Sequence, residues 1–131
     1  MKKITTILLC CFILFSAKAQ DSKQKIERVC LDYIEGFYEG DTSKLIGCLN
    51  PALFKFGYWQ DKKTGNYAPD GNMTWRQAVD YAQRVYEKKN FAKANAPKKV
   101  EVLDIMNTIA AAKVTAWWGV DYILLAKQND K

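Results

Sequence analysis

The residue best suited to chemistry in this sequence is Asp121, an acidic side chain within a run that is otherwise apolar or aromatic. A carboxylate in apolar surroundings suits a general base, which makes Asp121 the candidate catalytic residue. A structural role is the alternative. Two positions after Gly119, the carboxylate would lie at the mouth of a hairpin and bond backbone amides or a lysine. The sequence leaves both interpretations open.

Aromatic side chains form a second candidate site, because flat aromatic walls suit a planar heterocycle or a polyketide ring. The alternative for most of them is packing in the core or in a dimer contact. Trp117 and Trp118 are adjacent, so in a strand they point to opposite faces and at most one can face a pocket. The predicted ligand-binding residues are Tyr33, Phe37, Phe56, Tyr58, Trp75, Trp117 and Tyr122.

Several other chemistries lack the residues they need. The sequence contains no histidine, which excludes Ser-His and Cys-His nucleophilic pairs. It also has no glycine-rich phosphate loop and no metal-ligand spacing, so no cofactor and no metal are predicted. Cys30 and Cys48 could pair in an oxidising compartment, or could both be small buried hydrophobes.

The first residues have the pattern of a secretory signal peptide. Lys2 and Lys3 precede the apolar run 7–15, and Ala17 and Ala19 occupy the positions that an export peptidase recognises. The run is too short to span a membrane. A lipid anchor at Cys10 or Cys11 is disfavoured, because neither follows a small residue. Residues 1–19 are therefore expected to be removed before Gln20, which leaves one domain, 20–131, in the periplasm or outside the cell.

Removal of this segment also changes the charge. The whole chain has 20 basic and 14 acidic residues, and the loss of Lys2, Lys3 and Lys18 leaves 17 basic residues and a net charge of +3. That excess is too small and too scattered to predict a nucleic-acid surface. No membrane association is expected after cleavage.

The remaining sequence predicts helices first and strands last. Apolar residues at three- and four-residue steps predict a helix over 22–39, which Gly40 can end in the left-handed conformation. Asp41 or Thr42 then caps a short helix that ends near Leu49. Aromatic alternation predicts a strand over 53–60. Residues 66–68 are expected to pair back before 69–71 break the chain. A capping box of Thr74 and Gln77 begins a third helix whose apolar stripe includes Tyr86.

Strands over 100–106, 109–117 and 120–127 complete the chain, which favours an α+β fold. A turn at Trp118-Gly119 would pair Trp117 with Val120 and place Asp121 on one face with Val114 and Ile123. One long strand bulged at Gly119 is the competing interpretation.

Four segments in order resemble the family described as putative lumazine-binding, within the nuclear transport factor 2-like (SnoaL-like) superfamily. Its Y-x-x-G-x-Y-x-G-D opening is similar to Tyr33–Asp41, and its W-x-x-x-V segment to Trp75–Val79. The Leu and Pro after its second helix match Leu49 and Pro51, whereas Asn50 stands where members often carry His. Its A-x-x-K-V and D-Y-x-x-L-x-K segments match residues 110–114 and 121–127.

The resemblance implies a cone-shaped, strongly curved antiparallel sheet (a cystatin-like α+β roll) wrapped around the long N-terminal helix. It also implies a further strand beginning just where the sequence stops, so Lys131 is expected to be a truncation. Related folds use a pocket aspartate to move a proton next to a carbonyl, the role that Asp121 would fill.

Three functions follow, because a fold does not fix a function. The first is an exported, non-catalytic protein that binds a planar small molecule. The second is a scaffold domain that forms a homodimer. The third is an isomerase, cyclase or dehydratase with Asp121 as the base.

Overall fold

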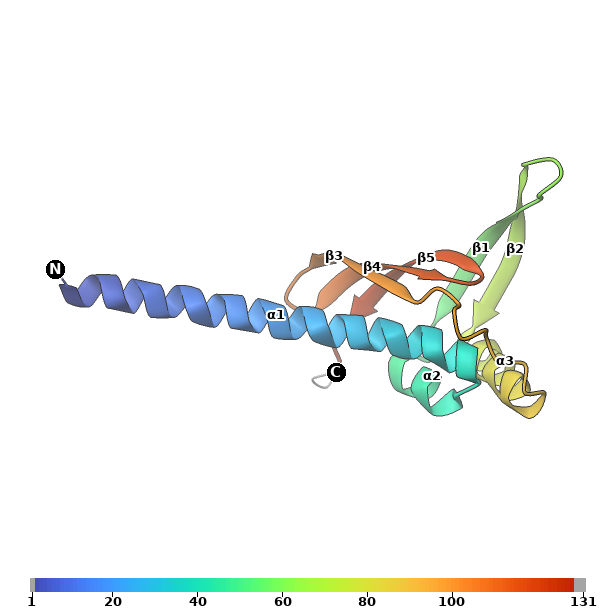
Figure 1. Ribbon diagram of the computed structural model, residues 1–131, viewed down its shortest axis with the longest axis horizontal. Coiled ribbons are helices and arrows are strands. Elements are labelled where there is room, and N and C mark those ends of the chain that lie inside the picture. Colours follow the sequence, from blue (N-terminus) through green and yellow to red (C-terminus); the bar gives the residue numbers. More distant parts are fainter. Residues whose placement is uncertain (1, 129–131) are drawn as a thin grey trace. The chain divides into compact units, whose positions relative to one another are not determined.

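The computed structural model describes residues 2–128, with side chains from residue 20 onward. It confirms the α+β class, since a long N-terminal helix is followed by antiparallel sheets that do not form a barrel (Figure 1). Among the described residues, no helix combines the length and apolarity needed to cross a membrane. The elements are α1 (Lys2–Glu39), α2 (Thr42–Cys48), β1 (Phe54–Gln60), β2 (Tyr67–Thr74), α3 (Trp75–Glu87), β3 (Lys99–Ile105), β4 (Ile109–Ala116) and β5 (Gly119–Ala126).

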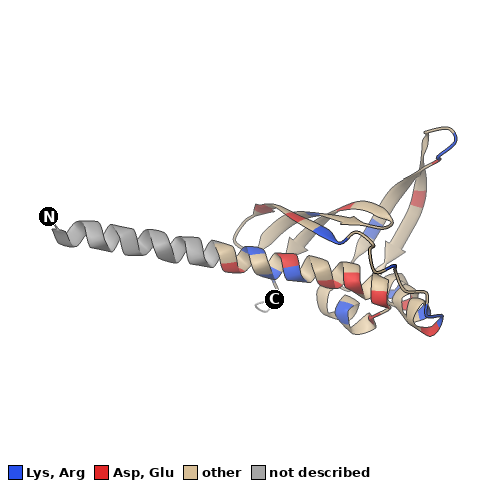
Figure 2. Cartoon of the chain, in the orientation of Figure 1, with Lys and Arg blue, Asp and Glu red and all other residues tan. Residues whose placement is uncertain are grey.

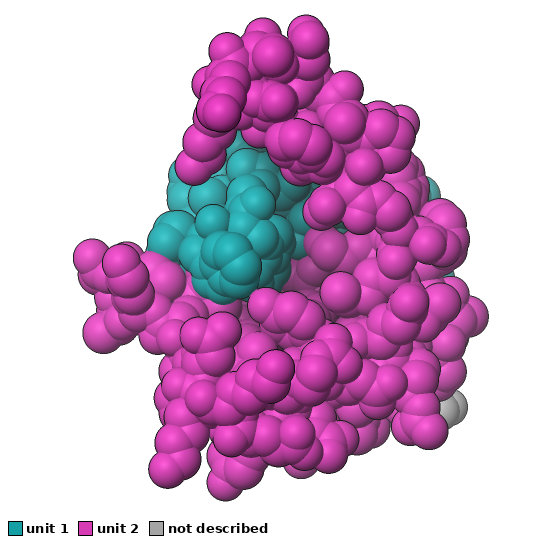
Figure 3. Space-filling model, turned by 90° about the vertical axis from the view of Figure 1, so that its right-hand side faces the viewer, with its two compact units in different colours: residues 1–31, 97–131 teal, residues 32–96 magenta. Residues whose placement is uncertain are grey.

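The chain forms two compact units, coloured separately in Figure 3. Unit 1 comprises residues 1–31 and 97–131, and unit 2 comprises residues 32–96. The first helix therefore contributes to both. It begins at Lys2 rather than Ser22, because residues 4–21 contain neither proline nor glycine to stop a helix.

Unit 1 contains a three-stranded antiparallel sheet in the order β3-β4-β5. The central strand β4 buries every second side chain, namely Ala112, Val114 and Ala116. This alternation gives the sheet one buried face and one exposed face.

The predicted hairpin in this sheet is correct in its faces and wrong in its register. Trp117 and Trp118 form the turn, and Ala116 pairs with Gly119, which takes φ +134° just after the turn rather than within it. Val114 consequently pairs with Asp121 instead of Ile123. The shift is two residues, so every side chain keeps its predicted face, and the single bulged strand does not occur.

Unit 2 begins with the last turns of α1, which ends at Gly40 in the left-handed conformation, as predicted. Asp41 then caps α2, because its carboxylate accepts hydrogen bonds from the backbone N–H groups of Ser43 (2.9 Å) and Lys44 (3.1 Å).

Both glycines of the Tyr33–Asp41 segment lie where another part of unit 2 comes very close. A Cβ on Gly40 would lie 2.5 Å from the backbone nitrogen of Tyr86, and a Cβ on Gly36 would lie 2.6 Å from Leu45. The absence of a side chain at these positions lets α1 approach α3 and α2 directly.

The two-stranded sheet of unit 2, here called the ribbon, corrects one prediction. Strand β2 continues through Pro69-Asp70-Gly71 instead of stopping there. Pairing shifts between Phe56 and Tyr58, so Asp70 and Gly71 form a bulge in which Gly71 takes φ +79°. Because each strand of a two-stranded sheet has a free edge, the missing N–H of Pro69 need not break the pairing.

Helix α3 begins at the predicted capping box. Gln77 N–H donates to the Thr74 hydroxyl, and the Gln77 side chain accepts from the Thr74 N–H at 2.8 Å. Its buried stripe consists of Ala78, Val79, Ala82 and Val85. Tyr86 was predicted to belong to this stripe and is instead exposed, with its ring 6.5 Å from that of Phe91.

Candidate functional site

The predicted site residues lie in three places. Tyr33, Phe37 and Trp75 belong to the helices of unit 2, Phe56 and Tyr58 to the ribbon, and Trp117, Asp121 and Tyr122 to the β4–β5 hairpin of unit 1.

The helical part of unit 2 contains a buried aromatic cluster, here defined as Tyr33, Phe37 and Tyr81. The rings of Tyr33 and Phe37 meet edge to face with centroids 5.2 Å apart, and Phe37 meets Tyr81 in the same way at 5.7 Å. Tyr33 and Phe37 are only 6% and 7% exposed, and Tyr81, at the edge of the cluster, is half-buried. The Lys55 ammonium lies 5.8 Å from the centroid of the Tyr33 ring, at cation–π distance.

Trp75 is the first residue of α3, directly after the cap. Its indole N–H is buried and, within residues 2–128, has no hydrogen-bond acceptor. A buried donor without an acceptor costs about 1 to 3 kcal/mol, so natural structures rarely retain one without a reason. A carbonyl oxygen or ring nitrogen of a bound molecule would satisfy this donor.

Phe56 and Tyr58 lie on an exposed face of the ribbon and are 68% and 64% exposed. They do not belong to the buried aromatic cluster. Their role as ligand contacts stays a prediction.

The carboxylate of Asp121 accepts a hydrogen bond within the β4–β5 hairpin. The indole N–H of Trp118 donates to a carboxylate oxygen of Asp121 at 2.9 Å. Asp121 is half-buried on the sheet face that carries Val114. The structural interpretation expected a hydrogen-bonded carboxylate at the hairpin mouth, and the Trp118 indole is a donor that it did not name.

The other two predicted residues of the hairpin are exposed. Trp117 is in the turn, with its ring centroid 5.8 Å from that of Trp118. Tyr122 is 76% exposed on the face opposite Asp121. Asp121 and Tyr122 therefore cannot contact one ligand from the same face of the sheet.

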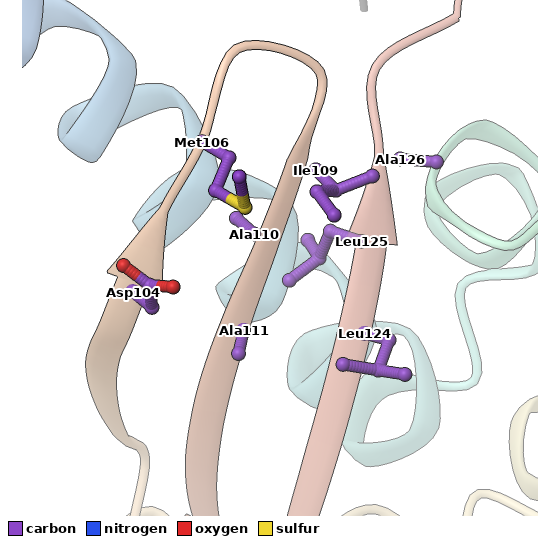
Figure 4. Close-up of a pocket in the computed structure, with 8 residues that line it drawn as sticks. All are labelled: Asp104, Met106, Ile109, Ala110, Ala111, Leu124, Leu125 and Ala126. Carbon is purple, nitrogen blue, oxygen red and sulfur yellow. The ribbon is translucent and has the colours of Figure 1, made fainter.

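Sequence reasoning missed a hollow at the far end of this sheet. It measures about 320 Å³ and has a mostly apolar lining, namely Asp104, Met106, Ile109, Ala110, Ala111, Leu124, Leu125 and Ala126. Figure 4 shows the small Ala111 on the central strand between Asp104 and Leu124. The run of alanines at 110–112 was the available signal, because small side chains on a central strand leave a depression between larger neighbours.

Ion pairs in unit 2 join α2 to the last turns of α1. Figure 2 colours the charged residues along these helices. The Lys44 ammonium lies 2.8 Å from a carboxylate oxygen of Glu35 and 2.8 Å from one of Glu39. These hydrogen bonds, to Glu35 first and then to Glu39, raise the pKa of Lys44 above its usual range. Lys44 therefore has a structural role, because its ammonium joins α2 to α1.

A second charged group lies on the exposed face of the unit 1 sheet. The carboxylate of Glu101 lies 3.2 Å from both the Lys113 and the Lys99 ammonium. Hydrogen bonds from Lys113 and then Lys99 lower the pKa of Glu101. In the described part of the chain, no group of three or more His, Cys, Asp or Glu side chains could hold a metal ion.

A comparison with known protein families shows which family the chain belongs to. Residues 21–131 match the family described as putative lumazine-binding, and the chain belongs to that family. The family lies within the nuclear transport factor 2-like superfamily, and its description points to a small-molecule ligand. No curated protein and no solved structure shows significant similarity to the chain.

Proposed function

We propose that this protein is an exported domain that binds a planar small molecule without chemically changing it. The proposal is carried by one observation, the buried indole N–H of Trp75, for which the described residues provide no acceptor. A planar heterocycle with a ring carbonyl or ring nitrogen supplies that acceptor. The family description, which names lumazine, supports a ligand of this class.

The buried aromatic cluster lies in the same unit as Trp75. Its rings pack against one another, so the support for a ligand rests on the Trp75 N–H and on the family description. The carboxylate of Asp121 accepts a hydrogen bond from Trp118, which favours a structural role over a catalytic one. Turnover by an isomerase or cyclase would require Asp121 as the base, and Asp121→Asn would then abolish it.

Isothermal titration of the protein with lumazine tests the binding proposal. Trp75→Phe keeps an aromatic ring but removes the N–H, and should weaken binding by about 5- to 10-fold, the value of one neutral hydrogen bond. Trp59→Phe, an exposed tryptophan in the same unit, is the matched control and should leave the affinity unchanged. A wild-type protein that binds no lumazine, or a Trp75→Phe variant that binds it equally well, contradicts the proposal.

Export is supported by the signal-peptide pattern of residues 1–19 and by a family match that begins at residue 21. Amino-terminal sequencing of the protein recovered outside the cytoplasm should begin at Gln20. An intact Met1 in all of the recovered protein would contradict this part of the proposal.

A second candidate, a homodimeric scaffold, is favoured by the exposed face of the unit 1 sheet. Leu124 is 90% exposed beside the hollow over Ala111, so a protruding apolar side chain and an apolar depression adjoin on one surface. Such a surface can be self-complementary about a two-fold axis. Light scattering should detect a dimer that Leu124→Lys dissociates and Ile46→Lys, at an exposed position of α2, does not. A wild-type monomer at all concentrations contradicts this candidate.

A further inference from the structure

One face of the ribbon in unit 2 is aromatic, exposed and free of charge. Alternate residues of β1 share this face with their partners on β2, because side chains of paired residues point to the same side of a sheet. Hereafter called the ribbon face, it consists of Phe54, Phe56, Tyr58, Gln60, Tyr67, Pro69, Asn72 and Thr74. All of these residues are exposed.

The rings of the ribbon face form a row. The centroids of Phe54 and Phe56 are 6.1 Å apart, with their planes inclined by 36°. Tyr58 continues the row along β1, where alternate residues repeat about every 7 Å. Tyr67 adds a fourth exposed ring from β2. A row of this kind is suited to an extended ligand whose repeating units each cover one ring.

Polar groups accompany these rings. Asn72 pairs with Phe56 across the ribbon, and Gln60 pairs with Tyr67. The Gln60 amide nitrogen donates to the Gly65 carbonyl at 2.9 Å, which holds the side chain near the hairpin turn. Side-chain amides and tyrosine hydroxyls can both donate and accept, so they suit a ligand that carries hydroxyl groups.

Charge narrows the choice of ligand. Lys55 lies on the other face, over the Tyr33 ring, and Lys62 and Lys63 lie in the turn at the tip (Figure 2). Asp70 lies in the bulge, between Pro69 and Asn72, and is not paired with any residue of β1. A phosphate backbone or an anionic membrane surface needs basic side chains beside the rings, and the ribbon face has none.

We propose that the ribbon face binds a neutral oligosaccharide chain. A pyranose ring presents an apolar face of C–H groups, which packs on an aromatic ring, and an edge of hydroxyl groups, which bond to amides. Successive sugars would cover Phe54, Phe56 and Tyr58, with Gln60 and Asn72 bonding their hydroxyls. This site is separate from the planar-ligand site at Trp75 and does not depend on it.

Titration calorimetry of the full chain with neutral hexasaccharides tests this proposal. Cellohexaose, mannohexaose and maltohexaose represent different linkages, and at least one should bind. Glucose and mannose should bind at least 10-fold more weakly, because a single sugar covers only one ring. Hexagalacturonate, which carries carboxylates, should not bind more tightly than the neutral chains. Absence of binding by all three hexasaccharides, or preference for the anionic one, overturns the proposal.

Variants separate the two faces of the same strand. Phe56→Ala should reduce affinity for the bound hexasaccharide at least 10-fold, whereas Trp59→Ala, on the opposite face, should change it less than twofold. Tyr58→Phe keeps the ring and should also change it less than twofold if stacking dominates. Equal losses in Phe56→Ala and Trp59→Ala overturn the proposal.

Light scattering completes the test. Should Phe56→Ala dissociate an oligomer while the wild type binds no sugar, a second copy of the chain covers the face and the proposal is wrong. Retention of hexasaccharide binding in Trp75→Phe is the expected result, and it distinguishes this site from the planar-ligand site.

Discussion

The two aromatic groups of unit 2 have similar composition and opposite surroundings. Tyr33, Phe37 and Tyr81 meet edge to face and lie among helices. Phe54 and Phe56 are in contact with each other, yet their rings are mostly exposed. The difference arises from the elements that carry them, because helices α1 and α3 approach closely at Gly40, whereas the ribbon has only two strands.

Residue type alone therefore does not separate packing from binding. A large aromatic side chain is buried when another element lies opposite it, and remains available when none does. Three pairs of variants and one pair of cysteines measure the contrast between packed and more exposed positions.

The largest effect is expected at Gly40. Gly40→Ala introduces a Cβ at φ +67° that would lie 2.5 Å from the backbone nitrogen of Tyr86. Backbone strain and overpacking together should cost about 4 to 5 kcal/mol, which can prevent folding. Gly65→Ala has a similar φ of +73° but open space around it, and should cost only about 1 kcal/mol. Chemical denaturation measures both, and equal losses would show that α1 and α3 do not approach as described.

Phe37 and Phe56 provide the next contrast. Phe37→Ala removes a buried ring from the buried aromatic cluster and should lower the free energy of unfolding by about 4 kcal/mol. Phe56→Ala removes an exposed ring and should change it by less than about 0.5 kcal/mol. A large loss in Phe56→Ala would mean that the ribbon face is covered in solution.

Ion pairs of equal length should differ in the same way. Lys44 lies 2.8 Å from Glu35, whose side chain is 15% exposed, whereas Lys25 lies 2.8 Å from the 61%-exposed Asp21. Lys44→Met should cost about 1.5 kcal/mol, because it leaves a half-buried carboxylate without its cation. Lys25→Met should cost less than about 0.5 kcal/mol. Denaturation in high salt should shrink the second loss more than the first, and comparable costs for both would contradict the prediction.

The smallest contrast concerns Cys30, which is buried, and Cys48, which is half-buried and donates its thiol to the Leu45 carbonyl at 3.7 Å. Burial, assisted by Glu27, raises the pKa of the Cys30 thiol to about 11, so the thiol stays protonated at pH 8. Iodoacetamide at pH 8 should therefore modify the half-buried Cys48 before Cys30, as peptide mass spectrometry can follow. Equal rates of modification would show that Cys30 is accessible.

The same raised pKa has a consequence for stability. A buried thiol whose folded pKa exceeds its unfolded value, about 8.5, stabilises the fold fully below that value. The contribution is lost as the pH rises toward about 11. The free energy of unfolding should decline over this interval, and Cys30→Ala should decline less.

Most of the fold could be predicted from the sequence wherever a local pattern carried the information. The cap at Asp41, the capping box of Thr74 and Gln77, and the helix end at Gly40 all depend on neighbouring residues, and all were predicted correctly. The faces of β4 and β5 followed from simple alternation. Pro69-Asp70-Gly71 was misjudged as a break because a bulge depends on the partner strand, which local composition does not reveal.

The candidate site was harder to predict, because contacts between distant segments determine it. The sequence identified Trp75 and Phe37 as aromatic candidates but could not show that one indole N–H lacks an acceptor. It also could not show that Trp118 would supply the hydrogen bond to Asp121, since that depends on which residues form the turn. Exposure of Phe56 and Tyr122 likewise depends on what lies opposite them.

The register of the β4–β5 hairpin limits how the turn at Trp117-Trp118 can vary in length. The observed pairing of Val114 with Asp121 differs by two positions from the predicted pairing with Ile123, so each side chain of β5 keeps its predicted face of the sheet. Removing or adding one residue at Trp117-Trp118 would exchange the inner and outer rows of β5, which would bring Tyr122 inward. Insertions and deletions here should thus survive in even numbers, and a library of turn lengths sorted by protease resistance should show that parity.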